Sequence, residues 1–304
     1  THMRRGNFQD CDHLALCASL CKYTELVTNP QRVPQALHEA IAAATSGRPG
    51  PVHLTIPRDA LEGEFNPSLA GPALGARGVA CNQAAAADAA VAEAAALVAQ
   101  AAKPLIVAGS GVFYADGGAA LEAFARRVGA PIVTPIWDRG VINEPSDLFM
   151  GVIGGASGEP DLQPRADLML IAGAAVDYRT RYLDRPPLRA DLKVVRVDVD
   201  PGQLHQAVEA DAALLGDPAT VFTQLAAAYT GGGHEAWLAE AQQVAGDFYA
   251  RWEQRPATAP GLMTGWDLAQ ALRPCFTDHT ALVLDGGNIG QWAHKILLPN
   301  RYPE

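Results

Sequence analysis

Apolar residues are grouped in short blocks along the 304-residue chain, and over 84–230 these blocks alternate between strand-like and helix-like patterns. Four runs are almost entirely apolar and end at or beside Gly, Pro or Asp: 104–108, 131–135, 167–173 and 193–201. The segment 84–102 precedes them and places Val91 and Val98 on one helical face. Near-continuous apolar strands separated by helices are typical of a parallel sheet with both faces covered. We therefore predict an α/β fold whose complete central domain, 84–230, is a doubly wound parallel sheet.

Residues 1–62 end on a helix and a strand joined by a Gly/Pro-rich turn. Leu37 and Ile41 share one face of the expected helix, and 52–57 alternates between apolar and polar residues as a strand does. This order predicts the closing half of an α/β unit. The residues that follow, 63–83, contain Gly and Pro without a helical or strand period, and we interpret them as a linker.

The last part of the chain begins a further α/β unit. Residues 231–260 hold a polar, Ala-rich helical pattern and then a Pro-rich break, which predicts a connector helix and a linker. Over 261–304, a helix with Thr264 as its N-cap residue is followed by an apolar strand at 281–284. The central domain is thus expected to be flanked by parts of two further α/β domains.

Composition excludes several classes of protein. The chain carries 23 Lys and Arg against 33 Asp and Glu residues, a net charge of −10, and has no basic stripe of the kind that follows a nucleic-acid backbone. No apolar run approaches the roughly 18 residues that a membrane span needs, and the polar N-terminus lacks an apolar signal core. The five cysteines form no CxxC pair, so zinc and redox motifs are unsupported. We expect a cytoplasmic protein with neither a nucleic-acid nor a membrane partner.

Candidate ligand contacts follow the predicted strands, because open parallel sheets bind ligands beyond the carboxyl ends of their strands. Gly109 and Gly111 follow the first strand but lack the third glycine of a dinucleotide fingerprint, so turn geometry and nucleotide contact are both open. Asp177 and Arg179 follow the third strand and could contact a nucleotide's ribose or phosphate, or form a loop salt bridge. Asp198 ends the fourth, where it could accept ribose hydroxyls or simply close the strand.

A sharper candidate follows the last predicted strand. Gly286 and Gly287 would let the backbone approach a phosphate closely, and Asn288 could donate or accept a hydrogen bond, although a plain turn has the same composition. The eight histidines have no ligand-like spacing. The sequence contains no GxSxG, HExxH or GxxxxGK[ST] motif, so it offers no signature of a serine hydrolase, a zinc protease or a P-loop enzyme.

In their order along the chain, these segments resemble the thiamine diphosphate-dependent enzymes of the acetolactate synthase-like family. That family also includes benzoylformate decarboxylase, oxalyl-CoA decarboxylase and 2-hydroxyacyl-CoA lyase. The segments that carry the resemblance are 46–59, 103–111, 166–174, 197–201 and 285–293. The last is similar to the family's Asp-x-Gly-x-x-x-x-Trp-Ala segment, which meets the cofactor's diphosphate. The resemblance implies that 1–62 is the C-terminal part of a pyrimidine-binding domain and 261–304 the start of a diphosphate-binding domain.

The resemblance also implies an activity. The complete protein is expected to be a decarboxylase, lyase or carboligase that acts on a 2-keto acid or acyl donor with thiamine diphosphate and Mg²⁺, as a homodimer or homotetramer. The catalytic glutamate and the Mg²⁺ ligands of the family would lie outside this chain, so no catalytic or metal residue is assigned and the chain alone is expected to be inactive. The alternative is a non-catalytic nucleotide-binding or assembly module that holds ADP or FAD.

Two departures from the family pattern affect the substrate and the flavin. Acetolactate synthases carry Arg-Phe-Asp-Asp-Arg where this chain has Ala175 to Arg179, and loss of the first arginine weakens the prediction of FAD. Ile289 stands where those synthases place a histidine beside the cofactor. The resemblance therefore favours another member of the family over a true acetolactate synthase.

Overall fold

The chain folds into two compact units, Thr1–Asn82 and Gln83–Glu304. A computed structural model describes the following residues: 6, 8, 11–69, 83–138, 141–142, 146–254, 261–277, 280 and 283–296. None of the helices in this described part is long and apolar enough to cross a membrane.

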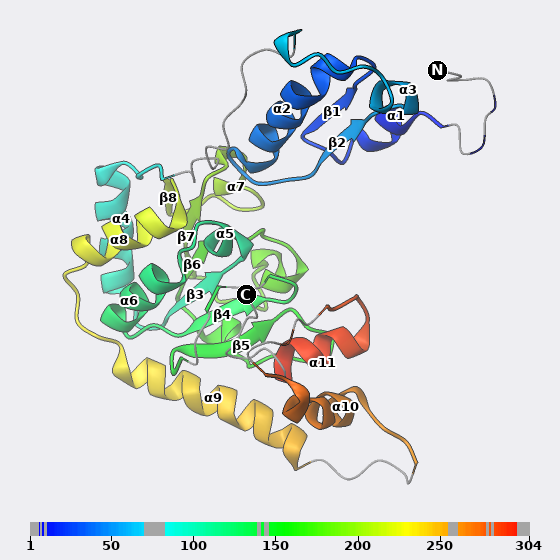
Figure 1. The fold of residues 1–304 in the computed structure, drawn as a ribbon. Coiled ribbons are helices and arrows are strands. Elements are labelled where there is room, and N and C mark those ends of the chain that lie inside the picture. Colours follow the sequence, from blue (N-terminus) through cyan, green and yellow to red (C-terminus); the bar gives the residue numbers. More distant parts are fainter. Residues whose placement is uncertain are drawn as a thin grey trace. The chain divides into compact units, whose positions relative to one another are not determined.

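The first unit contains a two-stranded parallel sheet with helices packed against it (Figure 1). Its elements are α1 (His13–Cys17), β1 (Tyr23–Leu26), η1 (Pro30–Arg32), α2 (Val33–Thr45), β2 (Val52–Thr55), α3 (Arg58–Leu61) and η2 (Pro67–Leu69). The helix and strand expected near Leu37 and at 52–57 are therefore present as α2 and β2. The buried face of α2 is formed by Ala36 and Ala40, whereas Leu37 is 51% and Ile41 45% exposed. Small alanines let the helix approach the strands closely.

The second unit is built on a six-stranded sheet in which all pairs are parallel and the order is β5-β4-β3-β6-β7-β8 (Figure 1). The strands are β3 (Pro104–Ala108), β4 (Ile132–Pro135), β5 (Phe149–Ile153), β6 (Leu168–Ala172), β7 (Lys193–Asp198) and β8 (Ala212–Leu215). The four apolar runs of the sequence correspond to β3, β4, β6 and β7. The edge strands β5 and β8 were not predicted, since one is interrupted by a glycine and the other has only four residues.

Helices cover both faces of this sheet, which confirms the α/β doubly wound fold. They are α4 (Asp88–Gln100), α5 (Ser110–Tyr114), α6 (Gly118–Val128), η3 (Gln163–Arg165), η4 (Tyr178–Leu183), α7 (Pro201–Leu204), α8 (Pro218–Ala228), α9 (Glu235–Glu253), α10 (Gly265–Leu272), η5 (Arg273–Cys275) and α11 (Asn288–Ile296). Side chains of α4, α6 and α8 form one apolar core with the sheet. On the other face α9 buries Trp237, whose indole N–H donates to the Pro104 carbonyl at 2.8 Å.

The C-terminal segment contains the predicted helix at α10. Thr264 caps it by accepting from the Asp267 N–H, and the Asp267 carboxylate accepts from the Thr264 N–H in return. The strand expected at 281–284 falls partly on residues 281 and 282, which lie outside the described residues, and residues 283 and 284 are not in a strand. The boundaries expected between the central domain, the connector and the third domain stay predictions.

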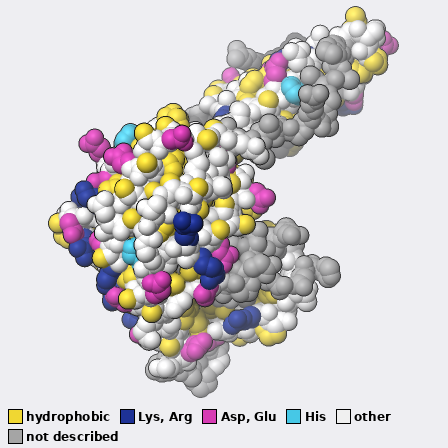
Figure 2. All heavy atoms as spheres, turned by 90° about the vertical axis from the view of Figure 1, so that its left-hand side faces the viewer, with side chains coloured by type: hydrophobic (Ala, Val, Ile, Leu, Met, Phe, Trp, Pro, Cys, Tyr) yellow, Lys and Arg dark blue, Asp and Glu magenta, His cyan; other side chains and the backbone are white. Residues whose placement is uncertain are grey.

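Charges on the surface are mixed in sign. On the face drawn in Figure 2, the Lys and Arg side chains of the described residues are interspersed with Asp and Glu rather than gathered in a stripe. Acidic side chains are thus present among the basic ones on this face, in agreement with the net charge of −10.

The strand order creates a switch point between β3 and β6. The chain moves outward in one direction from β3 to β5 and in the other from β6 to β8, so the turns that follow β3 and β6 lie next to each other. They touch through backbone alone: a Cβ added at Gly173 (φ +56°) would lie 2.6 Å from the Gly111 Cα. Glycine is required here both by the positive φ and by the lack of space.

We expect Gly173→Ala to lower the free energy of unfolding of the second unit by about 3 kcal/mol. Alanine is strained at this positive φ, and its methyl group would overlap the backbone of Gly111. Urea unfolding followed by tryptophan fluorescence measures this unit alone, since all five tryptophans lie beyond residue 83. Gly232→Ala is the matched control, because a Cβ there meets nothing within 4 Å. Equal midpoints for the two variants would contradict the packing role of Gly173.

Candidate functional site

The turn after β3 uses its backbone N–H groups within the protein. The Gly109 N–H donates to a carbonyl of β6 at 2.9 Å, and the Gly111 N–H donates to the Gly173 carbonyl at 2.9 Å. Between them, the Ser110 N–H donates to the Asp138 carboxylate at 3.3 Å. A carboxylate of the protein thus takes the place in this turn where a phosphate would accept. The structure shows turn packing for Gly109 and Gly111, and their contact with a nucleotide stays a prediction.

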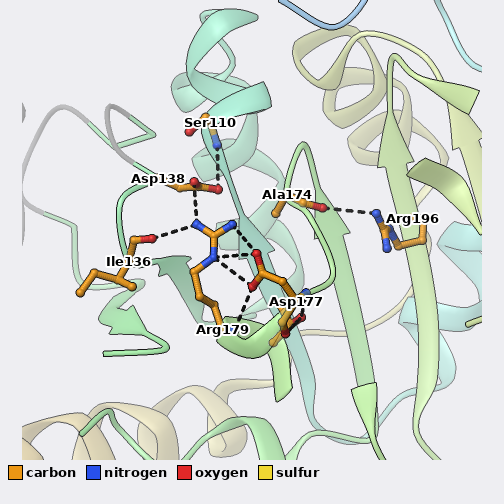
Figure 3. A network of polar contacts seen from close by, with 8 residues as sticks. Ser110, Ile136, Asp138, Ala174, Asp177, Arg179 and Arg196 are labelled. Carbon is orange, nitrogen blue, oxygen red and sulfur yellow. Dashed lines mark hydrogen bonds and ion pairs between the residues drawn. The ribbon is translucent and has the colours of Figure 1, made fainter. Parts of the chain in front are cut away.

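Arg179 joins the turns that follow β4 and β6 (Figure 3). Its Nε and Nη2 donate to the Asp177 carboxylate at 3.0 and 2.8 Å, and its Nη1 donates to the Ile136 carbonyl at 2.8 Å and to the Asp138 carboxylate at 2.9 Å. The Arg179 side chain is only 12% exposed. Because Asp138 also accepts from Ser110, one ion network connects the turns after β3, β4 and β6.

The charged forms of Arg179 and Asp177 are both stabilised in the folded protein. Burial opposes the charge of Arg179, but its bonds to Asp177 and Asp138 outweigh burial and raise the pKa of the guanidinium. For Asp177, burial likewise acts against ionisation, yet the bonds from Arg179 hold the pKa of the carboxyl below its usual value. Asp177 and Arg179 therefore form the loop salt bridge that the sequence left open, and their contact with a nucleotide remains a prediction.

Asp198 closes β7 at the same edge of the sheet. Its carboxylate is buried and accepts from the Asp200 N–H at 2.9 Å, while Asp200 caps the short helix α7 by accepting from the Gly202 N–H at 2.9 Å. The strand-ending turn is thus observed. That Asp198 contacts a ribose stays a prediction.

Arg196, two residues before Asp198, is a candidate that sequence reasoning missed. Its side chain is 1% exposed, and its Nη2 donates to the Ala174 carbonyl at 3.3 Å (Figure 3). Within the described part of the chain, its Nε and Nη1 have no hydrogen-bond partner. Burial lowers the pKa of this guanidinium, against the opposing effect of Asp198. A charged residue inside the apolar run of β7 was the signal that could have identified it.

The turn at 285–288 is open and begins a helix of nine residues. A Cβ added at Gly286 or Gly287 would meet nothing within 4 Å, and Gly287 has φ +89°. Asn288 is the first residue of α11, and Ile289 beside it is 43% exposed. The exposed start of α11, at Asn288 and Ile289, therefore leaves room for an anion to approach, whereas Gly290 is buried.

Helix α11 packs against residues that follow β4 and β5. The ring of Trp137, which has φ +74°, lies 5.0 Å from that of His294. The Ser157 N–H donates to the Gln291 side chain at 3.3 Å, and Lys295 Nζ donates to the Ser157 hydroxyl at 2.9 Å. The turn at 285–288 is thus held beside the carboxyl edge of the sheet. Among the residues that the structure describes, no group of three or more His, Cys, Asp or Glu side chains could hold a metal ion.

Comparison with known proteins identifies the family of this sheet. Residues 91–225, which span α4 to α8 and all six strands, match the family described as thiamine pyrophosphate enzyme, central domain. The chain belongs to the thiamine pyrophosphate enzyme family. The switch-point turns and the ion network around Arg179 lie within this central domain, and the open turn at 285–288 lies after it.

The relatives of this chain are named as synthases and as a decarboxylase. The acetolactate synthase large subunit of Corynebacterium glutamicum is 33% identical over 72% of this chain and 35% of its own length. A probable 2-ketoarginine decarboxylase of Pseudomonas aeruginosa is 30% identical over 68% and 35%. The acetolactate synthase isozyme 1 large subunit of Escherichia coli is 24% identical over 97% and 51%. The chain spans about a third of the length of the first two and about half of the third.

We expect Arg179→Gln to lower the free energy of unfolding of the second unit by about 3 kcal/mol at pH 7, because two partly buried carboxylates lose their cation. Arg189→Gln is the control, since it removes an arginine whose ion pair with Asp191 is at the surface.

The pH dependence of this difference follows from the direction of the Asp177 shift. Its folded-state pKa lies below the unfolded-state value of about 3.9. The stability it contributes is present above that value and is lost as the pH falls through the folded-state pKa. Urea unfolding from pH 7 to pH 2.5 should therefore show the gap between wild type and Arg179→Gln narrowing in acid. A gap of constant size would contradict the assignment.

Proposed function

We propose that the complete protein is a thiamine diphosphate-dependent decarboxylase, lyase or carboligase that acts on a 2-keto acid or acyl donor. The match of residues 91–225 to the thiamine pyrophosphate enzyme central domain is the observation that carries this proposal. The relatives support its breadth, since one is named a synthase and another a decarboxylase. When bound, thiamine diphosphate supplies the carbanion stabilisation that this class of reaction needs.

The residues of this chain that fit the cofactor are those of the open turn. Gly286 and Gly287 leave room for a diphosphate to approach the backbone, and the first turn of α11 can donate N–H groups to it. The Asp285 carboxylate accepts from the Gly286 N–H at 2.7 Å and so holds the turn. Asn288 can add a side-chain donor. In this proposal the chain binds and orients the diphosphate, and no residue of the chain takes part in bond breaking.

The proposal includes Mg²⁺ with the diphosphate, held by ligands other than the described residues. It also keeps the finer expectation that a decarboxylase or lyase fits better than acetolactate synthase itself, because Ile289 replaces the histidine of those synthases and Ala175 their first arginine. We further propose that the complete protein works as a homodimer or homotetramer in the cytoplasm.

A nucleotide such as ADP or FAD is proposed as a second ligand of the central domain. The observation that favours it is Arg196, whose buried Nε and Nη1 have no hydrogen-bond partner among the described residues. A phosphate or ribose oxygen would satisfy them. The Arg179 guanidinium already donates to Asp177, Asp138 and the Ile136 carbonyl, so Arg196 is the arginine with donors left for such a ligand.

We expect Gly286→Ala in the protein expressed from the complete reading frame to weaken thiamine diphosphate binding about tenfold or more, because a methyl group displaces a charge-assisted hydrogen bond. Calorimetry with thiamine diphosphate and Mg²⁺ measures the affinity, and release of CO₂ from a panel of 2-keto acids measures activity. Gly232→Ala is the control. Failure of the wild-type protein to bind thiamine diphosphate would overturn the proposed function.

We expect Arg196→Met to have opposite effects on stability and on ADP affinity. It should raise the free energy of unfolding by about 1 kcal/mol, because it removes a buried guanidinium whose Nε and Nη1 have no hydrogen-bond partner among the described residues. It should weaken ADP binding about tenfold, because a charged donor is lost. Calorimetry with ADP and urea unfolding test the two parts, with Arg189→Met as the surface control. Unchanged ADP affinity, or none in the wild type, would contradict the nucleotide site.

A further inference from the structure

A cavity of about 400 Å³ lies away from the switch point, between the edge strand β5 and the helices α9, α10 and α11. Figure 1 shows these elements gathered at one side of the sheet. The volume falls within the range of small-molecule sites. Neither the open turn at 285–288 nor the ion network around Arg179 contributes to its lining.

Each helix presents one face to this cavity. Along α9 the lining residues include Gln242, Gly246 and Tyr249, spaced by about one helical turn. Along α10 they include Trp266, and Arg273 follows as the first residue of η5. A Cβ added at Gly246 would meet nothing within 4 Å. Glycine in a helix interior lowers stability relative to alanine, and here its missing side chain widens the cavity.

The walls contain both polar and apolar side chains. The larger apolar side chains among the lining residues are Met150 from β5, Trp266 from α10 and Ile296 from α11. Such walls favour a ligand with an aromatic or branched aliphatic body.

Lys295 also lines the cavity, but its Nζ contacts Ser157 and Gly158, which are not among the lining residues. It is 2% exposed, and its Nζ donates to the Ser157 hydroxyl at 2.9 Å and to the Gly158 carbonyl, which leaves one of its three N–H groups. Across the described part of the chain no carboxylate lies within ion-pair distance of it. Burial lowers the pKa of Lys295 to about 8, against the charge of Glu159, as expected for a cation that lacks a close anion.

Two further donors line the cavity. The Tyr249 hydroxyl has no hydrogen-bond partner among the described residues, and burial raises the pKa of Tyr249 to about 12, so it keeps its proton. Arg273 is exposed at the cavity and forms no ion pair with a described residue. Of the two lining carboxylates, Asp147 is paired with Arg126 at 2.8 Å, which leaves Glu253 at the exposed end of α9.

We propose that this cavity is a binding site for a small organic carboxylate with an aromatic or branched aliphatic body. The carboxylate would accept from Arg273 and Tyr249, and the body would lie against Met150 and Trp266. Because the walls come from the central sheet and from the segment that carries the turn at 285–288, an occupant would hold these two parts together. The site is separate from the proposed diphosphate contacts, so its test does not depend on thiamine diphosphate.

The test uses phenylacetate and 4-methylpentanoate as probes, with the uncharged phenylacetamide as the matched control ligand. Calorimetry on the 304-residue chain should give binding of both carboxylates and at least tenfold weaker binding of the amide, because the amide lacks the charge. The fluorescence of Trp266 should change with the same dissociation constant. Absence of binding at millimolar concentration, or equal affinity for the acid and the amide, would overturn the proposal.

Two variants locate the site. Gly246→Leu fills the cavity from a helical position with open space and should abolish binding of phenylacetate, while Ala236→Leu on an exposed part of α9 should leave it unchanged. Arg273→Gln should weaken phenylacetate about tenfold and leave phenylacetamide unaffected. Urea unfolding of each variant verifies that it is folded. Unchanged binding by folded Gly246→Leu would place the ligand elsewhere and overturn the proposal.

Discussion

The close approach of the two turns at the switch point is the constraint on which the carboxyl edge of the sheet depends. Gly111 and Gly173 meet backbone to backbone, and each turn uses its N–H groups on the neighbouring strand. This contact leaves no room for a side chain at Gly111 or Gly173. Doubly wound folds commonly bind anions at such a point. Here the Asp138 carboxylate accepts from the Ser110 N–H, so the protein supplies its own anion.

Groups of the protein itself occupy the switch point, and this determines which hydrogen-bond donors remain available to a ligand. Arg179 uses its guanidinium on Asp138, Asp177 and the Ile136 carbonyl, and it thereby fixes three turns relative to one another. Arg196 lies one strand further along, and its buried Nε and Nη1 have no hydrogen-bond partner among the described residues. The two arginines thus differ in how far their donors are satisfied. Arg179 stabilises the scaffold. Burial of the unpartnered Arg196 donors costs free energy, which a hydrogen bond to a ligand could offset.

The fold was largely predictable because the strands β3, β4, β6 and β7 are buried on both faces and are hence mostly apolar. β5 was missed because it contains Gly151 at φ +107°, where a Cβ would collide with the Tyr249 hydroxyl. That glycine reflects a contact with a residue almost a hundred positions away, which no local pattern contains. The same limit applies to Asp138: nothing near it in sequence shows that it completes the network of Asp177 and Arg179.

The position of the open turn depends on the central sheet as much as on its own sequence. Trp137 adopts φ +74° directly after β4, and its ring lies against His294 and would meet a Cβ at Gly290 at 3.1 Å. The next residue, Asp138, is held by Ser110 and Arg179. The ion network therefore fixes the backbone from which Trp137 supports α11, and α11 in turn presents the turn at 285–288. The central domain can thus determine where the turn at 285–288 lies without being part of that turn.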